Sequence, residues 1–472
     1  MTEEPELVAI AEDASQQLAQ RASELSYDDL PEDVITTAKW AILDTLGVCL
    51  AATGPSSEYV EPVRRFIARG ASEGDVPAPT LGKRVSLFDA ILWLGCLAHT
   101  LDFDDLAGYS HPSGPVVCAA LPIASARGPV DGREMITAVA LGQDLVIRLA
   151  QATPHPMSEY GWLPSMPGTM GSALTTAKLL KLSAEQTQSS LGLALHQTSG
   201  TMQALARPGS AYRAIREAMN ARAGALSALL ASEGMPGDDE SIEGQYGYFP
   251  QFFRGEYDPD FIRGAGLLGP LISFKPWPCA GHPQLFLTAL DQLLAKGSVS
   301  PDRVKTIRIT GCSDLLPHQC APLETRAAPS HSIDAKISIP FLIGKLIRHG
   351  TITIQDFSTS GLRDQGAIDL GRKVEWSLDP SLARGANGFG IGRVEIEHED
   401  GTVVSAETEY PLGHPDNPLS WAQIVRKFGQ CVAVSALERD DVADEIVELV
   451  ENLESLPDAA MILESAFEGV TV

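Results

Sequence analysis

The chain has 472 residues, and 35 Lys and Arg against 61 Asp and Glu give it a formal net charge of −26 at pH 7. Hydrophobic residues make up 44% and charged residues 20%, which is typical of a folded protein and excludes a disordered or collagen-like chain. The acidic balance disfavours binding to nucleic acid or to an anionic membrane, because both need basic surface, but it leaves a small anionic substrate possible.

Seven cysteines are widely spaced without a CxxC pair, so the sequence predicts neither a disulfide framework nor a structural zinc site. The N-terminal segment is acidic and amphipathic, unlike a secretory or transit signal. The longest apolar stretches, such as residues 41–52, are too short and too interrupted to cross a bilayer. We therefore expect a cytoplasmic protein.

Residues 1 to about 268 show the spacing of apolar residues that predicts one helix after another. Several of these helices carry Ala, Gly, Ser and Thr on nearly every face, so they offer no polar side to water. We expect them to be buried in a thick helical core. The predicted helices include residues 33–52, 86–103, 132–152, 168–182, 183–200 and 216–234.

The pattern changes near Phe274. The β-branched alternation of residues 304–311 predicts a strand, and residues 393–410 predict a hairpin that turns at an Asp-Gly pair. Helical segments are predicted at 282–296, before the first strand, and at 339–350, between that strand and the hairpin. A mixed α+β region therefore follows the helical one.

Helical spacing returns after Trp421, which suggests that the closing helices pack back on the first region. The predicted fold is mainly α, with a large discontinuous all-helical domain and a smaller α+β lid domain. We place the helical domain at residues 1–268, completed by 413–472, and the lid at residues 269–412.

The segment from His99 to Asp105, followed by the loop at His111, is the most informative one for chemistry. Asp102, Asp104 and Asp105 end an apolar helix, where they cost desolvation energy unless they are exposed, paired or functional. Three interpretations stay open at this point. They are a solvated helix end, a divalent metal site that also uses the two histidines, and a general acid–base cluster in a cleft.

A second segment, residues 273–283, reads SFKPWPCAGHP, and its prolines favour an extended backbone up to His282. Lys275 lies between Phe274 and Trp277, so it can be partly desolvated, which depresses its pKa or makes it a clamp for a carboxylate. A surface lysine in a linker is the alternative. The segment lies at the predicted domain junction, where pockets are favoured, and this supports a functional role.

Two other segments offer candidate substrate-binding side chains. Arg207, Arg213 and Arg216 lie in an otherwise apolar stretch and could bind carboxylates, although solvated or internally paired arginines look the same. Tyr160 and Trp162 belong to a loop rich in Pro, Gly and aromatic residues and are candidate pocket walls. No dinucleotide, P-loop, nucleophile-elbow or HExxH motif occurs, so we expect no organic cofactor.

Together and in this order, these segments resemble the MmgE/PrpD family, which includes 2-methylcitrate dehydratase, cis-aconitate decarboxylase and iminodisuccinate epimerase. The resemblance implies a helical domain built from both ends of the chain, an α+β lid, and a homodimer. It also implies an active site between the domains that takes small polycarboxylates without cofactor or metal. The matching stretches are LDTLGVCLAA (43–52), AHTLDFDD (98–105), HPSG (111–114), GTMGSALTTAKLLKL (168–182), IEGQYGYFPQFFRGEYD (242–258) and SFKPWPCAGHP (273–283).

The resemblance also assigns residues. Asp102 and His111 match the acidic and imidazole members of the first motif, and Lys275 and His282 match the lysine and histidine of the junction motif. Arg213 falls close to a position where family members often carry a basic residue. Asp102, His111, Lys275 and His282 are therefore the expected catalytic residues, with Arg213, Tyr160 and Trp162 expected to bind substrate.

Two positions depart from the family pattern. Leu163 stands where many dehydratases and decarboxylases of the family carry a histidine, and Leu106 stands at or near the place of a threonine in the decarboxylase motif. Both departures count against cis-aconitate decarboxylation and weaken a 2-methylcitrate assignment.

We expect a cofactor-independent lyase of the dehydratase type, which abstracts a proton next to a carboxylate on a small di- or tricarboxylic acid. Three alternatives remain open. They are an epimerase of an iminodisuccinate-like dicarboxylate, a metal-dependent all-α enzyme built on the Asp102/Asp105 cluster, and a non-catalytic dimeric member of the family.

Overall fold

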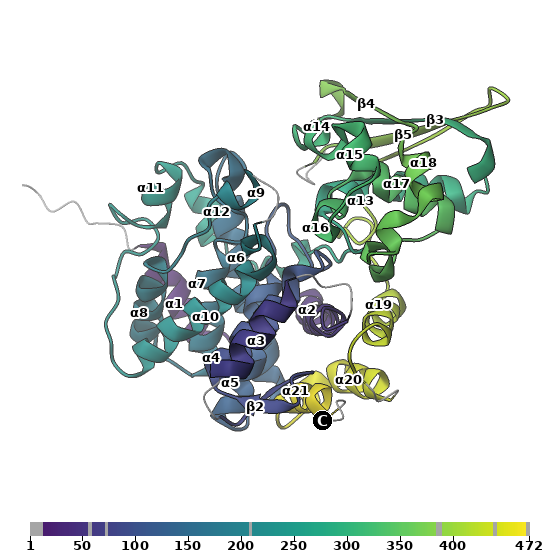
Figure 1. Ribbon diagram of the computed structural model, residues 1–472. Helices are drawn as coiled ribbons and strands as arrows, with labels where there is room; N and C mark the ends of the chain where they lie inside the picture. Colours follow the sequence, from purple (N-terminus) through teal and green to yellow (C-terminus); the bar gives the residue numbers. More distant parts are fainter. Residues whose placement is uncertain are drawn as a thin grey trace, which may run out of the picture.

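The computed structural model describes residues 13–54, 59–70, 74–206, 210–383, 389–437 and 441–468. The described chain is mainly α-helical, as predicted, and contains a two-stranded and a four-stranded sheet (Figure 1).

The first part of the chain is a set of helices with one short antiparallel ribbon. One of these helices, α2, is long and apolar enough to cross a membrane by length and composition alone, but most of it is buried in the core. The elements are α1 (Ala14–Glu24), α2 (Glu32–Ala51), α3 (Val60–Gly70), β1 (Val76–Ala78), β2 (Lys83–Val85), α4 (Leu87–Thr100), α5 (Ser113–Arg127), α6 (Gly132–Gln151), α7 (Gly168–Leu179), α8 (Ala184–Leu195), α9 (Gln203–Ala206), α10 (Tyr212–Ser232), α11 (Tyr248–Phe253) and α12 (Pro259–Arg263).

The small residues of these helices let their backbones approach closely, which is why the predicted helices pack in a dense core. A Cβ on Gly95 of α4 would lie 2.4 Å from the Cα of Ala218 in α10, so α4 and α10 touch backbone to backbone. On another side of α10, a Cβ on Gly224 would lie 2.3 Å from the carbonyl oxygen of Thr169 in α7. Helix α10 is therefore held between α4 and α7.

The second part of the chain builds the four-stranded sheet, in the order β4-β3-β5-β6. Strand β3 pairs with β4 in parallel and with β5 antiparallel, and β5 and β6 form the predicted antiparallel hairpin. Helices α13 and α17 join the inward-facing strand residues in a second hydrophobic core. The elements are α13 (Gly281–Ala295), β3 (Val304–Gly311), α14 (Leu315–Cys320), α15 (Leu323–Ala327), α16 (Ser332–Ala335), α17 (Ile339–His349), α18 (Gln365–Gly371), β4 (Val374–Leu378), β5 (Gly392–His398) and β6 (Val403–Thr408).

The last helices return to the first part of the chain. They are α19 (Trp421–Ala433), α20 (Val442–Glu451) and α21 (Ala460–Glu468), and in Figure 1 they lie beside α2 and α5, apart from the green sheet region. Phe428 of α19 packs against Gly47 of α2, where a Cβ would lie 2.7 Å from the ring. The larger hydrophobic core therefore draws on both ends of the chain.

The chain passes between the two cores twice, and the two crossings lie side by side. The backbone N–H of Phe274 in the first crossing donates to the carbonyl oxygen of Gly413 in the second, at 3.0 Å. Gly413 has φ +92, and a Cβ there would lie 1.8 Å from the carbonyl oxygen of Phe274, so only glycine fits. Lys275 follows directly after this contact.

Candidate active site

The site is built on the loop that follows α4. Asp102 in this loop has φ +52, in the left-handed region that residues other than glycine seldom adopt. Asp102, Asp104 and Asp105 are only 5%, 0% and 1% exposed. The interpretation of this segment as a solvated helix end is therefore wrong, and each carboxylate must find partners inside the protein.

Asp102 is paired with two cations from distant segments. Its Oδ1 accepts from Nζ of Lys275 at 2.8 Å, Nζ also donates to the carbonyl oxygen of Asp102 at 3.0 Å, and Arg213 donates to Oδ2. Lys275 is 1% exposed, so the alternative of a surface linker lysine is wrong. Since it reaches the loop from 173 positions along the chain, it joins the two predicted motifs in one place.

Asp102 and Lys275 keep each other ionised. Burial would raise the pKa of Asp102, but Lys275 and Arg213 outweigh it and keep that pKa below its ordinary value. Burial would lower the pKa of Lys275, but Asp102 and Asp104 outweigh it and raise that pKa. Lys275 is therefore a fixed cation at neutral pH and no proton acceptor.

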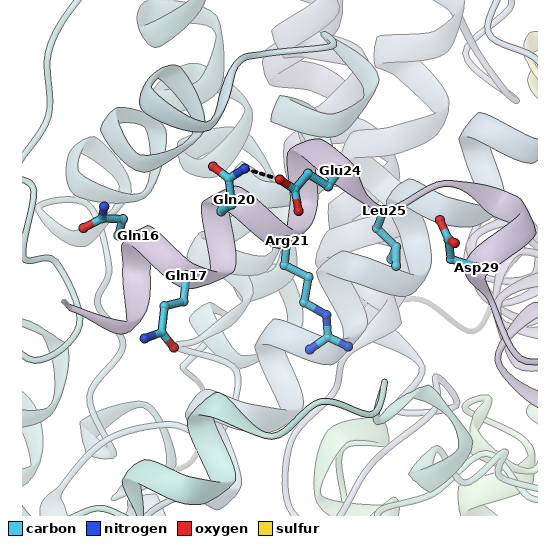
Figure 2. Close-up of a pocket in the computed structure, with 7 residues that line it drawn as sticks. All are labelled: Gln16, Gln17, Gln20, Arg21, Glu24, Leu25 and Asp29. Carbon is cyan, nitrogen blue, oxygen red and sulfur yellow. Dashed lines mark hydrogen bonds between the residues drawn. The ribbon is translucent and has the colours of Figure 1, made fainter. Parts of the chain in front are cut away.

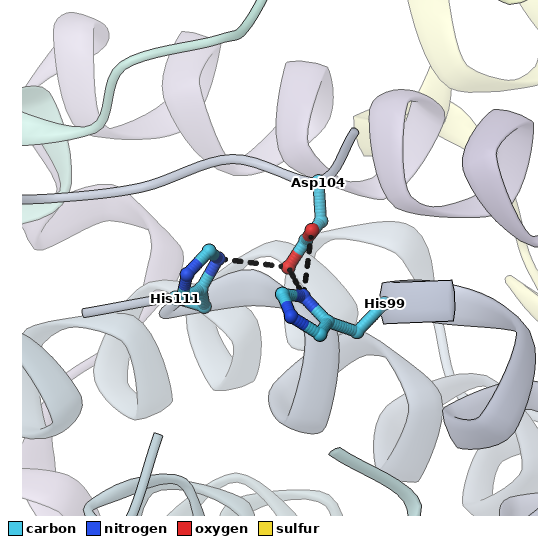
Figure 3. A group of neighbouring side chains, drawn as sticks. All are labelled: His99, Asp104 and His111. Atoms are coloured by element: carbon cyan, nitrogen blue, oxygen red, sulfur yellow. Dashed lines mark hydrogen bonds and ion pairs between the residues drawn. The ribbon is translucent and has the colours of Figure 1, made fainter. Parts of the chain in front are cut away.

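Two histidines lie against Asp104: His99 is hydrogen-bonded to it, and His111 lies at ion-pair distance (Figure 3). Nδ1 of His99 lies 2.9 Å from its Oδ1, and Nδ1 of His111 lies 2.9 Å from its Oδ2. An ionised carboxylate can only accept, so each Nδ1 carries hydrogen and each Nε2 is left with its lone pair. Nζ of Lys275 lies 3.9 Å from Asp104 and adds positive charge on the same carboxylate.

The charge states around Asp104 follow from burial and from these contacts. Burial would raise the pKa of Asp104, but His99, His111 and Lys275 hold it well below its ordinary value. Burial lowers the pKa of His99 to about 3 and also lowers that of His111. Both imidazoles are therefore neutral near pH 7, and His111, the more exposed of the two, is the candidate proton acceptor at Nε2.

The accessible side of the cluster consists of an imidazole and a guanidinium. The side chains of His111 and Arg213 are 13% and 14% exposed, against 0% for Asp104 and 1% for Lys275. A small molecule can therefore reach a base and a cation, while the groups that orient them stay buried.

Asp105 has a different environment from Asp104. Its carboxyl accepts from the backbone N–H and the hydroxyl of Ser113, at the first turn of α5, and Gln143 donates to the same hydroxyl at 2.8 Å. Burial raises the pKa of Asp105 to about 8, despite the Ser113 contacts. Asp105 is mostly protonated at neutral pH and fastens the loop to α5.

Among the described residues, one group offers a possible set of metal donors: His99, Asp104 and His111, whose donor atoms lie within 4.8 Å of one another. Asp102 and Asp105, which the metal hypothesis included, turn to other partners. Both Nδ1–H groups of the three-residue group are directed at Asp104, and Lys275 already supplies a positive charge there. The donor set therefore fits a hydrogen-bonded relay better than a cation.

The structure does not bring the remaining predicted residues to the cluster. The ring of His282 pairs with Gln319 and packs on Phe389, and burial lowers its pKa to about 4. Tyr160 donates to Glu256 at 2.5 Å, and the indole of Trp162 donates to a backbone carbonyl at 2.9 Å. Both aromatic residues pack against a third hydrophobic cluster.

Of the other two arginines in that stretch, Arg216 does not join Arg213 in pairing with Asp102. Arg216 forms an internal ion pair with Glu217 at 3.0 Å. Arg207 lies outside the described residues.

A pocket of about 260 Å³ lies at the junction beside the cluster. Its wall includes Leu106, Lys275 and Phe389, together with Leu412 and His414 of the second crossing, but not His111. The size is that of a small organic acid.

A more open pocket of about 830 Å³ lies on the surface along α1 (Figure 2). Polar side chains such as Gln17 and Gln20 line it, and Arg21 is committed to the carbonyl oxygens of Gly264 and Ala265. None of the predicted site residues lines it, so size alone does not locate the site.

Two buried lysines at the same loop were missed in the sequence. Nζ of Lys336 donates to the carbonyl oxygen of Thr100 at 3.0 Å, and Nζ of Lys427 donates to that of Phe103 at 2.8 Å. Lys336 gives no pattern that would single it out. Lys427 falls on the apolar face of its helix, three residues after Ile424, and that position could have marked it as buried.

Comparison with known proteins agrees with the motifs. The family model for the MmgE/PrpD N-terminal domain matches residues 16–260, and the model for the MmgE/PrpD C-terminal domain matches residues 277–453. A cis-aconitate decarboxylase of Aspergillus terreus is 26% identical over 94% of each chain. The cis-aconitate decarboxylases of Homo sapiens and Mus musculus are each 24% identical, over 93% of this chain and 91% and 90% of theirs.

Proposed function

Because the chain belongs to the MmgE/PrpD family, we propose that it is a lyase that acts on a small di- or tricarboxylic acid by moving a proton at the carbon next to a carboxylate. Several similar relatives are named cis-aconitate decarboxylase, which supports a polycarboxylate substrate. The observation that carries the proposal is the convergence of His111, Lys275 and Arg213 on two buried carboxylates.

Arg213 and Lys275 hold the substrate by charge. Arg213 donates one hydrogen bond to Asp102, and its guanidinium has further N–H groups that can bind a substrate carboxylate. Lys275, which pairs with the same Asp102, contributes a second, fixed positive charge. Both cations stabilise the negative charge that develops on the substrate carboxylate when the neighbouring carbon loses a proton or carbon dioxide.

His111 moves the proton. Asp104 holds Nδ1–H of His111, so Nε2 is free to take the proton from carbon. In a dehydration the imidazolium then gives this proton to the leaving hydroxyl, and water departs. In a decarboxylation the carbon dioxide leaves first, and His111, which has taken a proton from water at Nε2, delivers it to the carbanion.

We propose that no organic cofactor and no metal take part, since Lys275 supplies the positive charge at Asp104. Elemental analysis tests this proposal against the metal-dependent alternative. Stoichiometric Mg²⁺, Mn²⁺ or Zn²⁺ in active enzyme, with loss of activity in chelator, would contradict it.

We also propose that the two hydrophobic cores correspond to the two predicted domains, and that the enzyme is a cytoplasmic homodimer. Met219 of helix α10, which is 37% exposed, supports a partner on that face. Sedimentation analysis tests the dimer, and a monomer at micromolar concentration would contradict it.

NMR of purified enzyme in D₂O with cis-aconitate, citrate, 2-methylcitrate and iminodisuccinate tests the reaction. We expect loss of water or carbon dioxide from one of them, with deuterium at the reacting carbon. Deuterium exchange with inversion and no loss would favour the epimerase. Binding without turnover or exchange would favour the non-catalytic dimer. That alternative is supported by Leu106 and Leu163, which depart from the residue pattern of the family.

A further inference from the structure

Lys336 is a buried cation that reaches the site loop from the second core. It follows α16 and is 3% exposed. Its Nζ donates to the carbonyl oxygen of Thr100 at 3.0 Å and lies 5.6 Å from the ring centre of Phe357. The contact joins residues 236 positions apart and connects the second core to the last residue of α4.

The backbone of the same residue holds the other half of the site. The carbonyl oxygen of Lys336 accepts from the backbone N–H of Ala280 at 3.0 Å. Ala280 is the N-cap of α13 and lies between Lys275 and His282 in the junction motif. Lys336 therefore contacts both motifs, one through its side chain and the other through its backbone.

The position of the ammonium has a physical reason. The last carbonyl groups of a helix have no partner within it and carry the negative end of the helix dipole, so a cation there is favourable. Thr100 is the last residue of α4, and only two residues later Asp102 takes its left-handed conformation and meets Lys275. Where α4 ends thus decides where the Asp102 carboxylate lies.

We propose that Lys336 is a positioning residue for the reaction: its ammonium fixes the end of α4 against the segment that carries Lys275, and so assembles the Asp102–Lys275–Arg213 cluster. The role rests on the function proposed above. Lys336 acts through the loop and does not touch the substrate.

The kinetic test compares Lys336→Met, which keeps length and loses charge, with Lys336→Arg, which can still donate to Thr100. Lys305→Met is the control, because Lys305 pairs with Glu397 on the outer sheet surface with 58% of its side chain exposed. We expect Lys336→Met to lower kcat by about 10- to 100-fold with KM changed by less than about threefold, because the reacting geometry is lost. Lys336→Arg recovers part of kcat, and Lys305→Met matches the wild type.

Two outcomes would overturn the proposal: an unchanged kcat in Lys336→Met, or a raised KM at constant kcat, which would indicate direct substrate contact. A third variant, Lys336→Ala, leaves room for an added alkylammonium ion. Recovery of kcat with ethylammonium supports positioning, since a collapsed fold would not recover. Absence of recovery in a folded variant counts against it.

Amide hydrogen exchange of residues 100–106 gives an answer without any substrate. We expect faster exchange there in Lys336→Met and no change in Lys305→Met, and equal protection in all proteins would refute the positioning role. If wild-type enzyme turns over no carboxylate, the proposed function fails, and this measurement still decides whether Lys336 holds the loop.

Discussion

Asp104 and Asp105 are neighbours in the chain, but at neutral pH the first is ionised and the second is mostly protonated. Asp104 lies against two imidazoles beside Lys275, whereas Asp105 is buried against Ser113 with a pKa near 8. The difference arises from partners, because both carboxyls are almost fully buried. It makes the two positions a matched pair for mutagenesis.

We expect Asp104→Asn to lower kcat by about a hundredfold, because an amide cannot accept from both imidazoles and its NH₂ group forces one ring into the other tautomer. Asp105→Asn resembles the protonated acid and should keep most of the activity at pH 7. Steady-state kinetics of the two variants at matched stability test this. Equal losses would mean that Asp104 has no special role in orienting His111.

The raised pKa of Asp105 also predicts how stability depends on pH. The folded protein keeps a proton on Asp105 up to about pH 8, while the unfolded chain loses it near pH 4, so stability falls as pH rises between these values. His99 and His282 have lowered pKa values, so they are neutral in the folded protein and add little to the pH dependence of stability above about pH 7.

From pH 7 to 8 we therefore expect wild type to lose about 1 kcal/mol relative to Asp105→Asn. Urea unfolding of both proteins at the two pH values measures the difference. Parallel losses in both would show that Asp105 titrates normally.

At the residue scale, four of the candidate site residues could be identified from the sequence, and the fold brings them together. They are Asp102, His111, Lys275 and Arg213. The sequence could not foresee that Asp104 lies against two histidines, since a run of three aspartates does not reveal which of them faces which partner.

Helix α19 is tied to α2 by a buried ion pair that also supports the site loop. Lys427 and Asp44 are 2.6 Å apart and are 5% and 4% exposed. The ammonium lies 3.9 Å from the ring centre of Phe103 as well as donating to its carbonyl oxygen. A C-terminal helix thus supports the loop as well.

We expect Lys427→Met to destabilise the protein by about 3–5 kcal/mol, because it leaves Asp44 buried without a counter-charge. The double variant Asp44→Leu with Lys427→Met should recover most of this loss, since it removes both charges together. Chemical denaturation of both variants measures the free energies of unfolding. A double variant as unstable as the single one would show that the unpaired Asp44 charge does not cause the loss.

The elements themselves were predictable to different degrees. Strand 304–311 and the hairpin turn at Gly401 are as the sequence predicted, since local periodicity and turn residues determine them. The short helices α14 to α16 were not predicted, because four to six residues are too few to show periodicity. Lys336 lies next to one of them, so no sequence pattern marked it as buried.

At the scale of the whole molecule, the two backbone crossings between the cores lie side by side, where Phe274 donates to Gly413. The composition shift near Phe274 marked this place in the sequence. The hydrogen bond between the crossings could not be predicted, because it joins residues 139 positions apart and depends on how the chain between them folds.

We expect Gly413→Ala to be strongly destabilising and to lower activity, because the new methyl group would meet the carbonyl oxygen of Phe274 next to Lys275. Gly401→Ala is the control: its φ is +83, but a Cβ there meets no atom within 4 Å, so it should cost only about 1–2 kcal/mol of backbone strain. Thermal unfolding and kcat of both variants test this. Similar losses would show that strain alone, and not the clash, matters at Gly413.

The side-by-side crossings have a mechanical consequence. Because the two crossings are hydrogen-bonded to each other, each restrains the other where the chain enters and leaves the second core. Lys275 is the next residue after Phe274, so its backbone is anchored at the same point, and its side chain extends from there to the Asp102 carboxylate. A change that separated the crossings would therefore move the ammonium away from its counter-ion.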